Sequence, residues 1–502
     1  MASAPLTVEL ANPEATVRFA EDVALALQQG DCLCLSGDLG AGKSTFARAL
    51  IRAIADDPDL EAPSPTFTLV QNYQLRLPVA HMDLYRLGSP DELDELGLDD
   101  ALGEGVALIE WPEKALELLP EDRVMIRFDG IGESRTVTIS APEPFSIRLE
   151  RSRAARAFLE ANLGGHVIRC HLQGDASSRT YETIRPQDSD PLILMNAPRK
   201  PDGPPVRDGL PYSQIAHLAE DVVPFVAIAG WLRSQGFAAP DILGQDLDQG
   251  FLLVENLGTE GIIDQDGKPD PERYGVAIDC LAALHARDLP GPLPAGERLH
   301  HVPAYDARAM QIEVELLTDW YLPWRRGSSV PDQERQTYLG LWQDLFARLE
   351  SAEKALVLRD YHSPNLIWRS ERTGLDRLGI IDFQDAMIGP SAYDVASLCQ
   401  DARVTVDPHL AGQLLDRYVA VRQGANPDFD EAGFREAYAI MAAQRAAKIL
   451  GIFVRLKQRD GKPGYLRHLP RIEAYISASL AHPALQPLRN WFTKAGIGQS
   501  ES

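Results

Sequence analysis

The residues with the clearest chemistry lie in GDLGAGKST, which fits G-x-x-x-x-G-K-[ST] with Gly37, Gly42, Lys43 and Ser44. An apolar stretch, DCLCLS, precedes this segment and an amphipathic stretch, STFARALIRAI, follows it, so the sequence predicts strand, loop and helix in that order. In such a loop, main-chain N–H groups and the positive end of the helix bind phosphates. Lys43 would reach the β- and γ-phosphates of ATP, and the Ser44 hydroxyl would ligate Mg²⁺. The predicted nucleotide-binding positions here are Gly37, Gly40, Gly42, Lys43, Ser44 and Thr45.

Two acidic residues follow apolar segments, as a phosphate loop requires. Asp83 ends VAHMD, and Glu110 ends VALIE and is followed by Trp111. One acid would hold Mg²⁺ and the other would polarise the attacking water. Thr66 and Thr68 in SPTFTLVQNY either sense the γ-phosphate or belong to an ordinary β-edge.

The four segments GDLGAGKST, SPTFTLV, HMDLYRL and IEWPE, in this order, resemble the bacterial ATPases of tRNA threonylcarbamoyladenosine biosynthesis (TsaE-like). The resemblance implies ATP hydrolysis coupled to a metal-containing transferase and its paralogous partner (TsaD-like and TsaB-like proteins), which modify adenosine 37 of certain tRNAs. It also implies roles by position: Lys43 and Ser44 for nucleotide and metal, Thr66 for the switch-like segment, Asp83 for metal, Glu110 for catalysis of hydrolysis, and Trp111 for nucleotide binding.

A second set of chemical residues lies in VLRDYHSPNLIW and the following LGIIDFQDAMIGPSAYD. Asp360 and Asn365 are spaced as in a kinase catalytic loop, where the Asp accepts the substrate hydroxyl proton and the Asn holds Mg²⁺. Asp382 follows an apolar strand and takes the place of the main metal-binding carboxylate. His362 is either a substrate contact or a packing residue, and Asp394 is expected to brace the catalytic loop through backbone hydrogen bonds.

Nucleotide contacts of this second site are predicted from two weaker segments. GDASSRTYETI contains a short turn with Ser177 that would cover the phosphates, and FLLVENLGT is a strand that runs into a hinge. Backbone groups near Glu255 and Leu257 would bind adenine.

These segments resemble the aminoglycoside phosphotransferase and choline kinase superfamily, and within it the cell-wall amino-sugar kinases (AmgK-like). The resemblance implies ATP-dependent phosphorylation of the anomeric hydroxyl of N-acetylmuramate and N-acetylglucosamine in peptidoglycan recycling. Two positions depart from the family pattern. Leu358 replaces a His, and Met195 or Asn196 stands near the usual phosphate-binding Lys, whose role would pass to Arg179 or Arg185 or to Mg²⁺ alone.

The elements that must position these residues predict two domains. Alternating strand-like and helix-like patterns predict an α/β P-loop NTPase domain over residues 1–143. A bilobal, protein-kinase-like α+β domain is expected over 144–502, with an N-lobe at about 150–258 and a helical C-lobe at about 259–502. The stretch FREAYAIMAAQRAAKILGIFVRL has the clearest helical spacing of apolar residues.

Composition favours a soluble cytoplasmic protein. The sequence shows neither an apolar run of spanning length nor a secretory signal, and its five cysteines form no CxxC pair. Cys32 and Cys34 are expected in the core, on one face of a strand. Residues 1–140 hold 25 acidic and 10 basic side chains, which places most of the net charge of −24 there. We expect no stable direct binding of nucleic acid and no membrane association; a basic protein partner would suit this surface.

Three readings of the whole chain remain open at this stage. The first is a bifunctional enzyme, a P-loop ATP hydrolase fused to an amino-sugar kinase. The second keeps the kinase fold but phosphorylates an aminoglycoside or another small alcohol; Arg445 and Lys448 favour a carboxylated sugar only if they are not simply solvated. The third is a regulatory ATP-binding fusion. Trp320, Tyr321 and Trp324 either stack on a sugar or form a helical core stripe.

Overall fold

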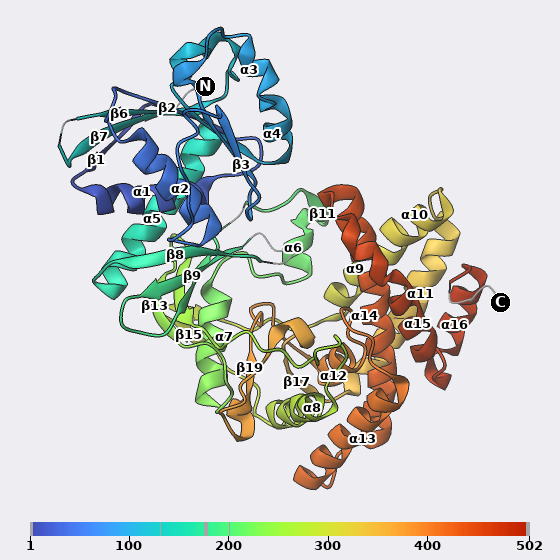
Figure 1. Cartoon of the computed structure of the whole chain (residues 1–502). Helices are drawn as coiled ribbons and strands as arrows, with labels where there is room; N and C mark the ends of the chain where they lie inside the picture. Colours follow the sequence, from blue (N-terminus) through green and yellow to red (C-terminus); the bar gives the residue numbers. More distant parts are fainter. Residues whose placement is uncertain (1–3, 131, 175–178, 200, 498–502) are drawn as a thin grey trace. The chain divides into compact units, whose positions relative to one another are not determined.

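The computed structural model describes residues 4–130, 132–174, 179–199 and 201–497. The chain folds into two compact units, Met1–Asn196 and Ala197–Ser502. The first unit contains a large sheet with its helices, a long helix and three further strands, and the second unit is mostly helical (Figure 1). The domain boundary predicted at 143/144 is not tested by this division into units, and it stays a prediction.

A seven-stranded sheet forms the centre of the first unit, in the order β1-β7-β6-β2-β5-β4-β3. The neighbouring pairs β6/β2, β2/β5 and β5/β4 are parallel, and β1, β7 and β3 add antiparallel edges. Parallel strands end at one edge of the sheet, which is where the predicted phosphate loop and acids follow them. The strands are β1 (Leu6–Leu10), β2 (Cys32–Ser36), β3 (Val70–Tyr73), β4 (Val79–Asp83), β5 (Val106–Glu110), β6 (Val124–Asp129) and β7 (Arg135–Ser140).

Helices cover both faces of this sheet. On one face α1 (Pro13–Ala26) and α2 (Lys43–Ala55) pack Phe19 and Phe46 against the strands. On the other face α3 (Glu92–Glu95) and α4 (Leu98–Glu104) pack Leu93 and Leu98. The side chains of β2 alternate between the two cores, so the expectation that Cys32 and Cys34 share a buried face is confirmed.

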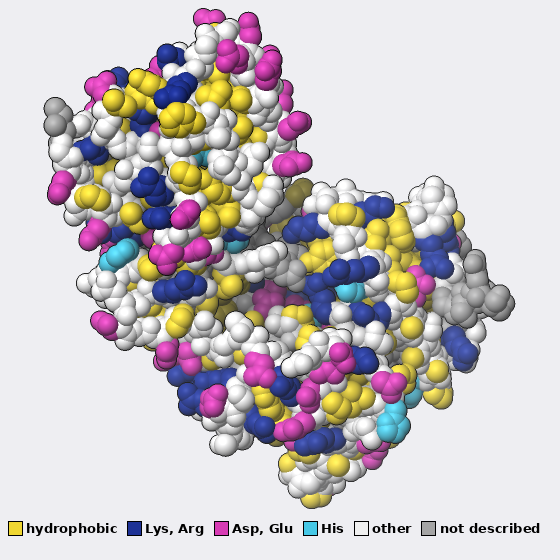
Figure 2. Space-filling model, viewed as in Figure 1, with side chains coloured by type: hydrophobic (Ala, Val, Ile, Leu, Met, Phe, Trp, Pro, Cys, Tyr) yellow, Lys and Arg dark blue, Asp and Glu magenta, His cyan; other side chains and the backbone are white. Residues whose placement is uncertain are grey.

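An acidic surface lies over α3 and α4 (Figure 2). Leu93 and Leu98 point into the core, and the carboxylates point outward. We call these residues the acidic face: Asp91, Glu92, Asp94, Glu95, Asp99, Asp100 and Glu104, all exposed.

The rest of the first unit consists of α5 (Glu143–Leu163) and an antiparallel meander of β8 (Val167–Leu172), β9 (Thr180–Pro186) and β10 (Leu192–Asn196). Phe145 and Leu149, near the start of α5, belong to the same apolar core as α1 and α2. Farther along α5, Arg156 pairs with Glu21 and Asp22 of α1 at 2.9 and 2.7 Å. One helix therefore packs against the P-loop domain along much of its length.

A buried ion cluster links α1, α5, β8 and β9. Arg169 of β8 donates to Asp22 at 2.7 Å, to the Ser152 carbonyl at 2.9 Å, and to both carboxylate oxygens of Glu182 at 2.7 and 2.8 Å. Burial raises the pKa of Asp22, and the two arginines oppose that shift. Because isolated charges are costly in the interior, each member of the cluster depends on the others.

The second unit is mostly helical, with short β-strands spread over residues 205–390. Its β-strands are β11 (Pro205–Arg207), β12 (Leu210–Pro211), β13 (Ile242–Asp246), β14 (Phe251–Glu255), β15 (Leu293–Ala295), β16 (Arg298–His300), β17 (Lys354–Val357), β18 (Leu366–Trp368), β19 (Leu378–Ile380) and β20 (Met387–Pro390). Its α-helices are α6 (Tyr212–Ile215), α7 (Val223–Ser234), α8 (Pro271–His285), α9 (Ala307–Leu316), α10 (Leu322–Arg326), α11 (Asp332–Arg348), α12 (Ala392–Cys399), α13 (Pro408–Ala425), α14 (Glu431–Asp460), α15 (Leu469–Ser479) and α16 (Gln486–Lys494). The strand predicted in FLLVENLGT is present as β14, and the segment predicted to be helical contains α8 to α16, whereas the lobe boundaries stay a prediction.

The central element of this unit is α14, the helix predicted most clearly from sequence. By length and composition, α14 alone within the described ranges passes the test for a membrane-spanning helix. Its apolar window is 89% buried inside the protein, as in the core helix of a globular unit. Gly451 allows its close packing on α9, because a Cβ there would lie 2.3 Å from the backbone carbonyl of Leu316.

Candidate active sites

The phosphate loop connects β2 to α2, as predicted. Gly37, Gly40 and Gly42 have φ values of +134°, +79° and +108°, which side-chain-bearing residues rarely adopt. At Gly37 a Cβ would also lie 2.3 Å from the Phe128 carbonyl oxygen. Gly42 is the N-cap of α2 and has no side chain that could accept from the N–H groups of the first helical turn. The loop thus presents main-chain donors to an anion.

Lys43 lies folded over its own loop. Its Nζ donates to the carbonyls of Gly37 at 2.6 Å and Asp38 at 2.9 Å, and lies 3.7 Å from the centre of the Trp111 ring. Burial lowers the pKa of Lys43, and the charge of Glu110 opposes this shift. A phosphate that enters the loop would replace these carbonyls as the hydrogen-bond acceptor of the Lys43 ammonium group.

The two predicted acids end neighbouring parallel strands, with Asp83 in register with Glu110. Glu110 is fully buried; its Oε2 accepts from Ser44 Oγ at 2.7 Å, and its Oε1 lies 3.0 Å from His81 Nε2. Asp83 accepts from Ser64 Oγ at 2.9 Å and from the Tyr85 amide at 3.0 Å. Glu110 is therefore the acid bonded to the predicted metal-ligating serine, whereas Asp83 faces the Ser64 segment.

The remaining predicted residues of this site take different positions. Trp111 adopts φ +60°, unusual for an aromatic residue, and packs on Tyr85 with ring centres 5.0 Å apart. Thr66 Oγ1 lies 3.5 Å from Ser64 Oγ, which connects it to Asp83 through that serine. Thr45 is exposed on the first turn of α2.

Sequence reasoning missed Arg135 and His81. Arg135, on β7, donates to the carbonyls of Ala41 at 2.6 Å and Gly40 at 3.3 Å, so it braces the phosphate loop from a strand that is separated from β2 by β6. His81 orients Glu110 from the adjacent strand. Both contacts depend on strand order and register, and no local motif signals them.

In the second unit, the catalytic loop follows β17 and is held by Asp394. The carboxylate of Asp394 accepts from the backbone N–H of Leu358 at 2.6 Å and of Arg359 at 2.9 Å, which confirms the expected bracing role. Arg359 adopts φ +74°, a conformation that these two hydrogen bonds hold in place. Leu358, which replaces the family's histidine, is buried.

The three residues predicted to carry the phosphoryl transfer lie together. Asn365 Nδ2 donates to the Asp360 carbonyl at 2.9 Å and to Asp382 Oδ2 at 3.3 Å. Gln384, which sequence reasoning did not select, donates from Nε2 to Asp382 Oδ1 at 2.8 Å. Asp382 itself has φ +59°. The chain thus places an amide and a carboxylate, two oxygen donors of the type that Mg²⁺ prefers, next to the candidate base.

Cations surround the candidate base. Burial alone would raise the pKa of Asp360, but the charges of Lys448, His362 and Arg445 outweigh it and lower the pKa. His362 Nδ1 in turn lies 3.7 Å from Asp401 Oδ1, which favours a structural role for this histidine. Asp360 is therefore kept ionised, as a proton acceptor must be.

Several other sequence-selected residues have structural roles. Ser177 lies outside the described residues. The Glu255 amide donates to the Asp241 carbonyl at 2.9 Å, and Leu257 is buried. Asn196 accepts from Arg151 at 2.9 Å and Met195 is buried. Both side chains are neutral, so neither replaces the positive charge of a phosphate-binding Lys.

The three aromatic residues Trp320, Tyr321 and Trp324 differ in burial, and the packing interpretation applies to one of them. Tyr321 is fully buried and bonded to Glu473 at 2.5 Å, whereas Trp320 and Trp324 are half-buried. Tyr321 therefore belongs to the core.

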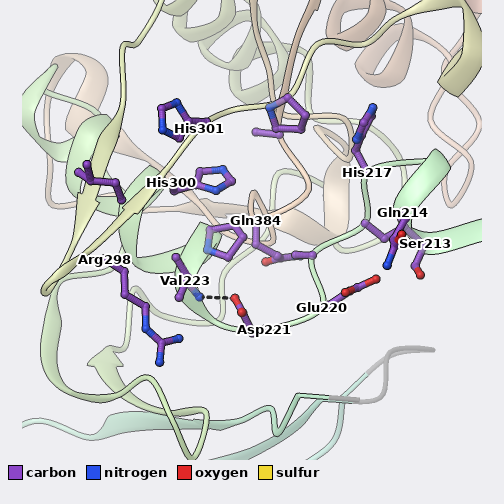
Figure 3. Close-up of a pocket in the computed structure, with 16 residues that line it drawn as sticks. Ser213, Gln214, His217, Glu220, Asp221, Val223, Arg298, His300, His301 and Gln384 are labelled. Carbon is purple, nitrogen blue, oxygen red and sulfur yellow. Dashed lines mark hydrogen bonds between the residues drawn. The ribbon is translucent and has the colours of Figure 1, made fainter. Parts of the chain in front are cut away.

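A polar cavity of about 460 Å³ opens beside Gln384 (Figure 3). Three atoms on its lining residues are buried without a hydrogen-bond partner: Glu220 Oε1, His300 Nε2 and Gln384 Oε1. His217, on the same wall, adopts φ +52°. Sequence reasoning missed this cavity, because its lining comes from three segments that lie far apart in the sequence: Ser213, Gln214, His217, Leu218, Ala219, Glu220, Asp221, Val223, Pro224, Arg298, Leu299, His300, His301, Pro303, Gln384 and Ala386.

Comparison with known proteins identifies both halves. Residues 10–137 match the family described as threonylcarbamoyl adenosine biosynthesis protein TsaE, and residues 170–434 match the phosphotransferase enzyme family. The chain is 40% identical over 133 residues to the tRNA threonylcarbamoyladenosine biosynthesis protein TsaE of Bacillus subtilis, which covers 26% of this chain and 82% of that protein.

The second half is similar to bacterial sugar kinases. The chain is 37% identical over 355 residues to an N-acetylmuramate/N-acetylglucosamine kinase of Caulobacter vibrioides, which covers 69% of this chain and 96% of that protein. A kinase of the same name from Pseudomonas aeruginosa is 34% identical over 314 residues, covering 61% of this chain and 82% of that protein. The chain therefore belongs to two families, the TsaE proteins of threonylcarbamoyl adenosine biosynthesis in its N-terminal part and the phosphotransferase enzyme family in its C-terminal part.

Proposed function

We propose that the chain is a bifunctional ATP-using enzyme. Its N-terminal domain is an ATPase that supports threonylcarbamoyl modification of tRNA, and its C-terminal domain phosphorylates the anomeric hydroxyl of N-acetylmuramate and N-acetylglucosamine. The observation that supports this most strongly is the presence of two separate sets of phosphate-handling side chains. One set surrounds Lys43 and Ser44, and the other joins Asp360, Asn365 and Asp382.

In the ATPase, each side chain has a proposed role that fits its contacts. The glycine loop and Lys43 bind the phosphates, Trp111, whose ring lies against Lys43 Nζ, contacts the nucleotide, and Ser44 with Asp83 holds Mg²⁺. Glu110 orients the attacking water, since it is buried and anchored by Ser44 and His81. When bound with the nucleotide, Mg²⁺ would neutralise part of the negative charge of the phosphates.

In the kinase, Asp360 accepts the proton of the sugar's anomeric hydroxyl as that oxygen attacks the γ-phosphorus of ATP and ADP leaves. Asn365 and Asp382 are the proposed Mg²⁺ ligands. No group of three or more His, Cys, Asp or Glu side chains within the described ranges forms a metal cage. Mg²⁺ bound with a nucleotide needs only one or two protein carboxylates, so the donors present fit the ion.

The sugar substrate is tested directly. Purified protein is incubated with labelled ATP and a panel of N-acetylmuramate, N-acetylglucosamine, an aminoglycoside and choline. We expect label on the two amino sugars at the anomeric position, and Asp360→Asn to lower the rate by roughly 10²–10⁴-fold. Transfer to the aminoglycoside alone would establish the alternative substrate, and unchanged transfer by Asp360→Asn would refute the assigned base.

The ATPase is tested independently of the kinase. Lys43→Ala should abolish the ATP hydrolysis that TsaD-like and TsaB-like proteins stimulate, and should leave sugar phosphorylation unchanged. An equal fall in both activities would show that the two sites are not independent. Stimulated hydrolysis in the wild-type chain also argues against a purely regulatory ATP-binding fusion.

The proposed setting is the bacterial cytoplasm, with ATP and Mg²⁺ for both reactions and peptidoglycan recycling as the use of the sugar phosphate. The acidic face over α3 and α4 would repel a tRNA backbone, which supports action through protein partners rather than stable direct binding of nucleic acid. No membrane association is proposed, because the apolar side chains of α14 are buried inside the protein.

A further inference from the structure

Arg445 is a buried cation without a hydrogen-bonded or ion-paired partner among the described residues. Its side chain lies in α14 and the residue is 5% exposed, yet it makes no hydrogen bond or ion pair with any described residue. Its guanidinium nitrogens keep some solvent access. By contrast, the Nε of Arg455, ten residues farther along the same helix, is buried without a hydrogen-bond partner. A guanidinium has five N–H donors and stays charged, so such an arrangement normally has an anionic partner.

Contacts of the neighbouring residues fix where this cation lies. On the same turn of α14, Gln444 Nε2 and Lys448 Nζ both reach the buried carboxylate of Glu313, at 2.9 and 2.8 Å. Arg359, the residue before Asp360, also donates to Glu313. Glu313 thus ties this turn of α14 to the catalytic loop. Gly451 keeps α14 against α9 two turns later.

The carboxylate of Glu313 is already occupied. Two cations, Arg359 and Lys448, share it, and Arg445 makes no contact with it. Burial would raise the pKa of Glu313, but Lys448 and Arg359 lower it to about 2. This carboxylate therefore stays ionised and is already paired with two cations. Glu313 therefore offers Arg445 no contact, and the acid on which the charge of Arg445 acts is Asp360, which places this cation near the candidate base.

We propose that Arg445 binds the carboxylate of an acidic sugar substrate and makes the kinase prefer that sugar over its neutral counterpart. The inference rests on the proposed sugar kinase function. N-acetylmuramate carries a lactyl carboxylate that N-acetylglucosamine lacks, so the two sugars form a matched pair that differs in the group concerned. A carboxylate held by two guanidinium N–H groups would satisfy both partners.

The test compares wild type, Arg445→Gln and a control, Arg459→Gln, which removes an exposed arginine from the same helix. Steady-state kinetics are measured with both sugars at saturating ATP, and the fold of each variant is checked by thermal unfolding. For Arg445→Gln we expect the ratio of kcat/KM for N-acetylmuramate to that for N-acetylglucosamine to fall by about 10- to 100-fold, the effect of a lost hydrogen bond to a charged group. Arg459→Gln should keep the wild-type ratio.

An unchanged ratio for Arg445→Gln, or an equal loss with both sugars, overturns the inference; an equal loss would assign Arg445 to the transferred phosphoryl group instead. Calorimetric titration with N-acetylmuramate in the absence of ATP gives a second readout, in which Arg445→Gln should weaken binding by a similar factor. If the wild-type chain phosphorylates neither sugar, the proposed function fails, and the titration still decides whether Arg445 binds the carboxylate.

Discussion

At the scale of single residues, Glu110 joins the end of β5 to the first turn of α2. It bonds to Ser44 on α2 and to His81 on β4, whereas Asp83, one strand away, bonds to Ser64. The two acids thus have different surroundings, although the sequence places both at strand ends.

We predict that Glu110→Gln lowers partner-stimulated ATP hydrolysis by about 10²-fold or more, because it removes the charge that orients water, while nucleotide binding persists. Asp83→Asn should instead weaken Mg²⁺-dependent nucleotide binding. Fluorescent nucleotide titration with and without Mg²⁺, beside the hydrolysis assay, checks both variants. Loss of Mg²⁺-dependent binding in Glu110→Gln alone would exchange the two roles.

A pH prediction belongs to Asp360. The reaction needs its carboxylate, and nearby cations lower its pKa, so the acid limb of kcat/KM should lie below the ordinary range of an aspartate. Lys448→Met removes one of these charges and should shift that limb to higher pH by roughly one unit. The profile is measured with N-acetylglucosamine, which has no titrating carboxyl. Lys457→Met, exposed on the same helix, serves as the control, and an unmoved limb in Lys448→Met would contradict the prediction.

Sequence reasoning found those residues whose chemistry is encoded locally. The glycine loop, the strand-end acids and the Asp360, Asn365 and Asp382 set all lie in short motifs with recognisable neighbours. His81 and Arg135 were not found, because their contacts arise only when the strands of the sheet come together, β4 parallel to β5 for His81 and β7 antiparallel to β6 for Arg135. Arg445 was selected but could equally have been solvated; only the tertiary burial of α14 distinguishes the two cases.

At the scale of elements, the contact between α14 and α9 positions the cations of the kinase site. The helical spacing of α14 predicted its existence, but not that nearly every face of it is covered. Gly451 is the residue that permits the close approach.

We predict that Gly451→Ala destabilises the protein by about 1–3 kcal/mol, since the new methyl group would overlap the Leu316 backbone and force the helices apart. Sugar phosphorylation should fall as well, because Arg445 and Lys448 would shift. Gly412→Ala is the matched control: it lies in α13 with no atom within 4 Å of its Cβ position and should be neutral or up to about 1 kcal/mol stabilising. Urea unfolding measures both, and equal stability of the two variants would argue against the close contact.

At the scale of the whole molecule, the α/β P-loop fold and the kinase-like fold followed from sequence, and the packing of α5 did not. Phe145 and Leu149 lie beyond the predicted junction at 143 and yet belong to the core of α1 and α2. The low contrast between apolar and polar residues along α5 gave no sign of this, since its buried positions include the charged Arg156.

A fragment of residues 1–143 should therefore be less stable than one of residues 1–164. The longer fragment retains two buried apolar side chains, each of which contributes about 1.5–3 kcal/mol, and ends at Gly164, the residue that caps α5. Guanidinium unfolding of the two fragments provides the comparison. Equal midpoints would show that the P-loop core is complete without α5.

The position of α5 also bears on how this gene can change. A break in the chain before Phe145 would leave the first product with an uncovered apolar surface, and the second product with Arg156 and Arg169 separated from Glu21 and Asp22. Fission into two free-standing proteins would then require several compensating substitutions at once. The union of the two enzymes in this chain can thus persist by packing alone, even if neither reaction influences the other.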